Sequence, residues 1–77
     1  MRLLIGNTIN KLRKTKGFRQ YFVASRMAVS RPTYAGWEKD RGCPSFIQIY
    51  ELVQLYNISM EEFTYMLEED NKPDQNR

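Results

Sequence analysis

The sequence contains no histidine and only one cysteine, Cys43, among its 77 residues. A single cysteine excludes an internal disulfide, and a zinc site would lack its usual ligands. Acid–base and nucleophilic catalysis also lack their usual groups, because most acidic residues gather in one late stretch that is typical of a solvated helix face. We therefore expect neither an enzyme nor a protein with a metal or another cofactor.

Long apolar runs are missing as well. No stretch of 18 apolar residues occurs, although 42% of the residues are hydrophobic, so neither a transmembrane span nor a disordered chain is predicted. The apolar part of the first 14 residues is too short for a signal peptide. A chain of this length has room for one small domain, which we expect to be cytoplasmic and to have no membrane partner.

Acidic residues are scarce in the first half of the chain. Residues 1–42 hold ten lysine and arginine residues against two acids, a net charge of +8, whereas residues 43–77 hold two basic residues against seven acids, a net charge of −5. The field of a polyanion would orient such a polarised chain and repel it in the opposite pose. The charge pattern favours a nucleic-acid partner for the basic half.

What the sequence does have is helical periodicity, with apolar residues at steps of three and four. It predicts an all-α fold of five helices, at about residues 3–15, 20–27, 31–39 and 46–56 and from residue 59 onward. Ser45 and Ser59 are expected to cap the last two helices, Ser59 in a capping box with Glu62, and Gly17 to end the first. The inward residues are expected to be Leu4, Ile5, Ile9 and Leu12 in the first helix and Phe46, Ile49, Val53 and Tyr56 in the fourth. Residues 1–69 are predicted to form the domain, and residues 70–77 a flexible polar tail.

Residues 18–38 are predicted to form a helix-turn-helix, in which two short helices meet at a turn and the second can enter a major groove. Its second helix has two possible starts: Ser30 caps it and Pro32 is its second residue, or Arg31 caps it and Pro32 is its first. Helical geometry places Tyr34, Trp37 and Glu38 inward and Pro32, Ala35, Gly36 and Lys39 outward.

Many landmarks along the chain together resemble the Cro and phage-repressor class, the XRE family of transcriptional regulators, over about residues 3–67. They include Ile9, Leu12, Arg13, Gly17, Phe18, Gln20, Val23, Ala24, Val29, Ser30, Arg31, Trp37, Glu38, Pro44, Ile49, Val53, Ile58, Ser59 and Phe63. The resemblance implies a compact five-helix, lambda-repressor-like domain. It also implies a homodimer, most simply a small repressor, that reads pseudo-palindromic double-stranded DNA with residues 31–39.

The resemblance and the outward face together suggest specific DNA contacts. Expected base contacts are Arg31, Pro32, Thr33, Ala35 and Gly36, and expected DNA backbone contacts are Arg19, Gln20, Ser30, Lys39 and Arg41. Arg31 is suited to a bidentate contact with guanine, or alternatively to a phosphate. Ala35 and Gly36 offer only close approach and apolar contact, so DNA shape is expected to supply part of the specificity.

Two further expectations concern packing. Arg13 and Glu38 match a pair that in the family joins the first and third helices, and we expect a salt bridge there. Ala28 stands where the family turn prefers glycine, so a left-handed backbone at this residue would be strained. Dimer contacts are expected among Tyr50, Leu55, Tyr65 and Met66, although Met66 also suits the core.

Two other functions remain open at the level of sequence. The run NISMEEF resembles the same region of Rgg-type regulators, so the chain could be the DNA-binding module of a longer, peptide-sensing protein. The helix-turn-helix could also serve a protein partner, as in a helical interaction module or an antitoxin. Salt-dependent affinity for duplex DNA separates the two DNA-binding functions, the small repressor and the Rgg-like module, from the protein-interaction module.

Overall fold

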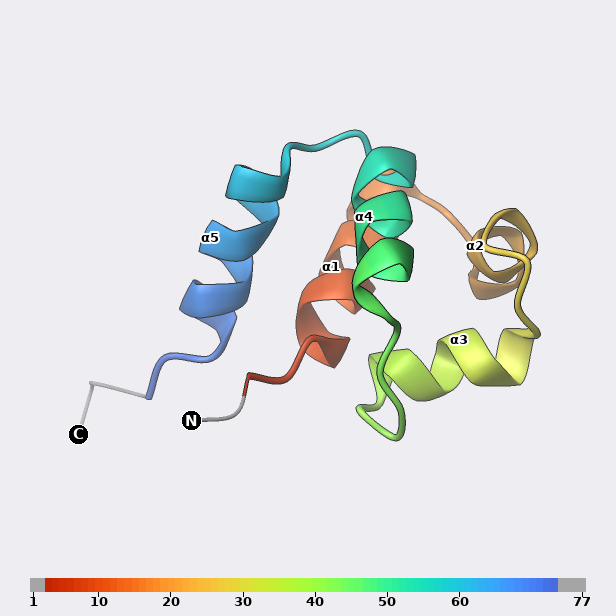
Figure 1. Ribbon diagram of the computed structural model, residues 1–77, viewed down its shortest axis with the longest axis horizontal. Helices are drawn as coiled ribbons and strands as arrows, with labels where there is room; N and C mark the ends of the chain where they lie inside the picture. Colours follow the sequence, from red (N-terminus) through yellow and green to blue (C-terminus); the bar gives the residue numbers. More distant parts are fainter. Residues whose placement is uncertain (1–2, 74–77) are drawn as a thin grey trace.

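Five α-helices make up the part of the chain that the computed structural model describes, residues 3–73, and this part contains no strand. They are α1 (Gly6–Lys16), α2 (Gln20–Arg26), α3 (Arg31–Glu38), α4 (Phe46–Leu55) and α5 (Met60–Asp70). Figure 1 shows α1 and α4 in the middle, α5 on one side, and α2 and α3 on the other. The prediction of an all-α, five-helix fold is confirmed.

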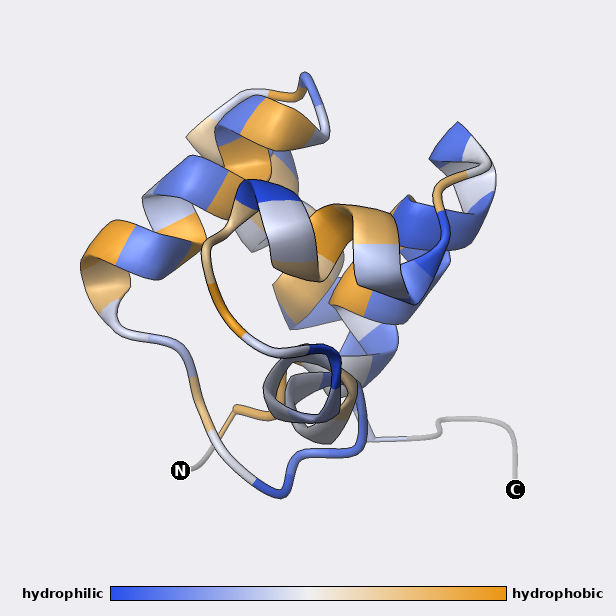
Figure 2. Ribbon diagram, turned by 90° about the vertical axis from the view of Figure 1, so that its right-hand side faces the viewer, coloured by the Kyte–Doolittle hydropathy of each residue, from blue (hydrophilic) through white to orange (hydrophobic). Residues whose placement is uncertain are grey.

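The helices enclose one hydrophobic core. Apolar and polar residues alternate in short steps along the helices (Figure 2), a pattern typical of helices that have one apolar side. The buried apolar residues are Ile5, Ile9, Leu12, Val23, Ala24, Met27, Tyr34, Trp37, Leu52, Val53, Tyr56 and Phe63. Full burial of such a side chain stabilises the fold by about 1.5–3 kcal/mol. Residues of the helix-turn-helix therefore help to form the core that supports it.

Serine hydroxyls cap the N-termini of the last three helices. The Ser45 hydroxyl accepts from the Gln48 N–H at 3.1 Å, and the Gln48 side chain returns a bond to the Ser45 N–H at 2.9 Å, which completes a capping box. The Ser59 hydroxyl accepts from the Glu62 N–H at 3.0 Å, but the predicted return bond from the Glu62 side chain is not formed. Each serine cap contributes about 1 kcal/mol to its helix.

Left-handed residues end several helices and turn the chain. Gly17, with φ of 75°, ends α1, and Asn57, with φ of 58°, follows α4. Ala28, with φ of 58°, lies in the turn between α2 and α3. For an alanine this conformation costs roughly 1–2 kcal/mol. The turn thus carries the strain that we expected for a left-handed backbone at Ala28.

The start of α1 differs from the prediction. The helix begins at Gly6 rather than near residue 3, and Leu4 is 43% exposed instead of buried. The cap comes from a distant side chain, because the Asp40 carboxylate accepts a hydrogen bond from the Gly6 N–H at 2.9 Å. The periodicity around Leu4 contained no sign of this long-range bond.

The buried face of α4 also differs from the prediction. Phe46 is 71% exposed, whereas Leu52, Val53 and Tyr56 are buried and Ile49 is partly buried. These four positions define the inward direction of the helix, and Phe46 in its first turn lies to one side of it. Phe46 is therefore a surface residue.

The predicted boundary at residue 70 lies too early. Asp70 closes α5, accepts a hydrogen bond from the Thr8 hydroxyl at 2.7 Å and pairs with Lys11. Asn71 then exchanges two 2.9 Å hydrogen bonds with the backbone of Leu4. These contacts tie the end of α5 to the start of the domain. Of the predicted tail, residues 74–77 lie outside the described residues.

Candidate functional site

The start of α3 is fixed by a serine cap. The Ser30 hydroxyl accepts from the Thr33 N–H at 3.2 Å, so Arg31 is the first helical residue and Pro32 the second. This geometry decides between the two starts that the sequence allowed. Pro32 lies in the first turn, where its missing N–H removes no intrahelical hydrogen bond.

The inward side of α3 is aromatic. Tyr34 is fully buried and Trp37 is 5% exposed, and their rings meet edge to face with centroids 5.9 Å apart. The Tyr34 hydroxyl lies 2.7 Å from that of Tyr56, which links α3 to the end of α4. These contacts set the rotation of α3 about its axis and leave its opposite side free.

Glu38 at the end of α3 is the centre of a polar network. Its carboxylate accepts hydrogen bonds from Arg13 Nε at 2.7 Å and from the side-chain amides of Asn10 and Gln20, each at 2.9 Å. The Glu38 side chain is only 3% exposed. The network joins α1, α2 and α3, and it contains the ion pair that we expected between Arg13 and Glu38.

The network keeps Glu38 ionised. Burial alone would raise the pKa of the carboxyl group, but hydrogen bonds from Arg13, Tyr34, Asn10 and Gln20 outweigh burial and lower its pKa to about 2. Burial is also the main cause of the raised pKa of Tyr34, which therefore stays protonated. The inner end of α3 thus holds one fixed negative charge whose partners fix its position.

Asn10 is a member of this network that was not predicted from the sequence. Asn10 lies three positions before Arg13, and residues at this spacing are neighbours on one helix face. That spacing, together with the predicted ion pair of Arg13, was the signal that could have identified it.

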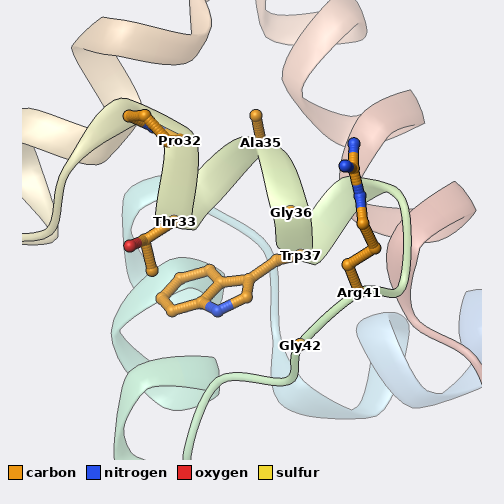
Figure 3. A pocket seen from close by; sticks show the side chains of 7 residues that line it. All are labelled: Pro32, Thr33, Ala35, Gly36, Trp37, Arg41 and Gly42. Atoms are coloured by element: carbon orange, nitrogen blue, oxygen red, sulfur yellow. The ribbon is translucent and has the colours of Figure 1, made fainter.

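A shallow hollow lies beside α3 (Figure 3). It is lined by Pro32, Thr33, Ala35, Gly36, Trp37, Arg41 and Gly42. Pro32 and Ala35 point to one side of the helix, and the Trp37 ring lies on the other. Four of the five predicted base contacts are brought together here, and Arg41 joins them from the following loop.

Arg31, the fifth predicted base contact, lies in a different hollow at the start of α2. This hollow is lined by Arg13, Phe18, Arg19, Gln20, Tyr21 and Arg31. Arg31 is therefore near two predicted backbone contacts, Arg19 and Gln20. One N–H of the Gln20 amide is used by Glu38, which leaves a second for another acceptor.

The other predicted contacts with the DNA backbone differ in whether their side chains are available to bind DNA. Lys39 and Arg41 are exposed at the end of α3. The Ser30 hydroxyl is already engaged, since it donates to the Thr33 hydroxyl at 2.9 Å and accepts from the Thr33 N–H. A DNA contact by the Ser30 side chain would therefore compete with the helix cap.

Asp40 anchors the loop after α3, a role that was not predicted from the sequence. Its backbone is left-handed, with φ of 57°, and its carboxylate bonds the first N–H of α1, where the helix dipole favours negative charge. A Cβ atom on Gly6 would lie 2.4 Å from the Glu38 carbonyl oxygen, so only glycine permits this approach. The end of α3 is thereby held against the start of α1.

The predicted dimer residues fall into two groups. Tyr50 on α4 and Tyr65 on α5 are 50% and 63% exposed, whereas Leu55 and Met66 are partly buried against the core. Two further exposed apolar side chains, Phe46 and Ile47, lie in the first turn of α4, one turn before Tyr50. We call Phe46, Ile47 and Tyr50 the α4 patch.

Across residues 3–73, no helix has the length and apolar character needed to cross a membrane. A family model described as helix-turn-helix matches residues 9–63, a segment that begins in α1 and ends in α5. The chain is also 36% identical over 62 residues to y4dJ, an uncharacterized HTH-type transcriptional regulator of Sinorhizobium fredii (strain NBRC 101917 / NGR234). That match covers 80% of each chain. No solved structure matches the chain.

Proposed function

We infer, from the premise that the chain belongs to the XRE-type helix-turn-helix family of transcriptional regulators, that α3 reads the major groove of a specific DNA operator. DNA binding and the regulation of transcription follow from the family. The observation that carries the finer proposal is the contrast between the two sides of α3. Tyr34 and Trp37 fasten the inner side, while small residues leave the outer side open to a close approach.

Charge supports this direction of docking. The exposed basic residues Arg19, Arg31, Lys39 and Arg41 lie on or beside α2 and α3, whereas α5 carries the acidic residues Glu61, Glu62, Glu68 and Glu69. Figure 1 shows α5 on the side of the molecule opposite α2 and α3. A duplex would attract the helix-turn-helix side and repel the α5 side.

The residues of the two hollows suggest separate contacts with the DNA backbone and with the bases. In the hollow at the start of α2, we assign Arg19 and the free N–H of Gln20 to phosphate. Arg31, which lines the same hollow from the start of α3, is assigned to a guanine. The outer side of α3 between Pro32 and Gly36 lies against base edges and thymine methyl groups. With so few long side chains, DNA shape contributes to the choice of site.

We further propose that the chain acts as a homodimeric repressor on a pseudo-palindromic operator. Family members place two reading helices about one duplex turn apart, which a single copy of this domain cannot do. The exposed apolar side chains on α4 and α5 supply candidate contact surfaces.

Selection of bound duplexes from a random pool tests the proposal, followed by titrations of the selected site at several salt concentrations. We expect two related half-sites and an affinity that falls steeply as salt rises. Arg31→Ala should weaken binding and relax the preference at one position of each half-site. A uniform loss across sequences would reassign Arg31 to phosphate. If the protein does not bind duplex DNA at low salt, the proposal is wrong and a helical interaction module becomes the better reading.

A further inference from the structure

Arg41 lies beside Gly36 on the surface of the protein. A Cβ atom on Gly36 would have the Cβ of Arg41 as its nearest neighbour, 4.0 Å away. The Arg41 N–H donates to the Gly36 carbonyl at 2.9 Å, so the loop folds back over the last turn of α3. Gly36 in the helix and Arg41 in the loop are therefore neighbours on the surface.

The side chain of Arg41 runs toward the outer side of α3. Figure 3 shows its guanidinium group on the side to which Pro32 and Ala35 point, in the hollow that all three residues line. Arg41 is exposed. Its five N–H donors therefore face the same space as the outer side of the helix.

The backbone around Arg41 is held in place on both sides. The bond to Gly36 fixes its own N–H, and the preceding Asp40 is tied to the start of α1 by the 2.9 Å bond to the Gly6 N–H. Asp40 and Gly6 thus orient the loop from outside the DNA-facing surface. A side chain that must match a base edge benefits from such a fixed origin.

We propose that Arg41 is a base-reading residue that recognises guanine in the major groove, rather than a backbone contact as its position after the helix suggested. Guanine offers the O6 and N7 acceptors that match the fork of an arginine side chain. The proposal rests on the proposed function, because it assumes that α3 enters the groove.

Arg41→Lys is the decisive variant, because lysine keeps the positive charge but loses the planar fork. Duplexes are selected with the wild-type protein, and the affinities of both proteins are measured for the selected site and for sites changed at each position. Besides the guanine assigned to Arg31, we expect the wild-type protein to prefer guanine at one further position of each half-site by about tenfold to a hundredfold. Arg41→Lys should lose most of this preference and bind unrelated duplexes almost as before.

Arg19→Lys is the matched control, since the same change at a proposed phosphate contact should leave every base preference in place. Circular dichroism checks that both variants are folded. If Arg41→Lys keeps the wild-type preference at every position, Arg41 does not read bases, even though the protein still binds its site. If the wild-type protein selects no duplex, the proposed function fails as well, so the two failures are distinguishable.

Discussion

At the scale of single residues, Glu38 ties the end of α3 to α1 and α2. A buried carboxylate is costly unless it is paired and hydrogen-bonded, and here Arg13, Asn10 and Gln20 all donate to it. Removing a donor leaves part of the charge unsatisfied, whereas neutralising Glu38 leaves Arg13 without its partner. The network thus makes the position of α3 depend on the charge state of one residue.

This dependence predicts a loss of stability in acid. The folded protein holds the pKa of Glu38 at about 2, against an ordinary value of 4.5. A lowered pKa stabilises the fold fully above pH 4.5, and the stabilisation is lost as the pH falls from 4.5 to 2. The shift corresponds to about 3 kcal/mol of unfolding free energy. Denaturant unfolding measured at steps between pH 6 and pH 2 checks this.

Two variants separate Glu38 from the other carboxyl groups. Glu38→Gln should be less stable than the wild type at pH 6 but should lose less stability between pH 4.5 and pH 2. Asp70 is the control, because its pKa is also lowered: burial opposes ionisation, and bonds from Lys11 and Thr8 outweigh it. Asp70→Asn should keep the steep fall that depends on Glu38. An equally steep fall in Glu38→Gln would contradict the assignment.

At the scale of elements, Gly36 lowers the stability of α3 but leaves room for DNA in the function that we propose. A glycine inside a helix costs about 1 kcal/mol relative to alanine, and Gly36 has open space around it, since a Cβ atom there would meet nothing closer than 4.0 Å. Packing therefore does not require glycine at this position. The close approach of DNA does, in the function that we propose.

Gly36→Ala is accordingly expected to raise the free energy of unfolding by about 1 kcal/mol and to weaken binding to the selected operator several-fold. Thermal or denaturant unfolding measures the first effect, and a binding titration the second. Gly42→Ala is a matched control in the following loop, where the new methyl group would lie 3.8 Å from the Trp37 ring and add no helix stability. If Gly36→Ala is more stable and binds as tightly as the wild type, no close approach occurs at Gly36.

The same elements show which helix boundaries could be predicted from the sequence. Periodicity and turn residues predicted α2, α3 and α4 to within one residue at each end, and the local serine caps Ser30 and Ser45 define the starts of α3 and α4. The predicted start of α1 was wrong because the first N–H of the helix, that of Gly6, is capped by the side chain of Asp40, 34 positions away. No local pattern encodes such a bond.

The candidate site was predictable to a similar degree. The sequence identified the outer residues of α3 and the pairing of Arg13 with Glu38. It did not show that Arg31 and Arg41 lie in different hollows. That separation depends on how the loop folds over Gly36, which follows from tertiary contacts of Asp40 and Arg41 rather than from their spacing.

At the scale of the whole molecule, charge bears on how two copies could meet. A two-fold dimer brings the same surface of each copy together, so its charges face themselves. On α5, Tyr65 is surrounded in sequence by Glu61, Glu62, Glu68 and Glu69, and a symmetric contact there would oppose like charges. The α4 patch offers three large apolar side chains with one acid, Glu51, directly after them. Charge therefore favours dimerisation through α4.

The double substitution Phe46→Ser and Ile47→Ser should then convert the dimer into a monomer in analytical ultracentrifugation. On DNA, it should weaken binding to the full operator far more than to a single half-site, because coupling between the two half-sites is lost. The folded core should be unchanged, since both side chains are more than 60% exposed. Tyr65→Ser is the control on α5 and should remain dimeric. If Tyr65→Ser is monomeric and the double variant is dimeric, the interface lies on α5 despite its charge. A monomeric wild type that binds one lone half-site would rule out the dimer altogether.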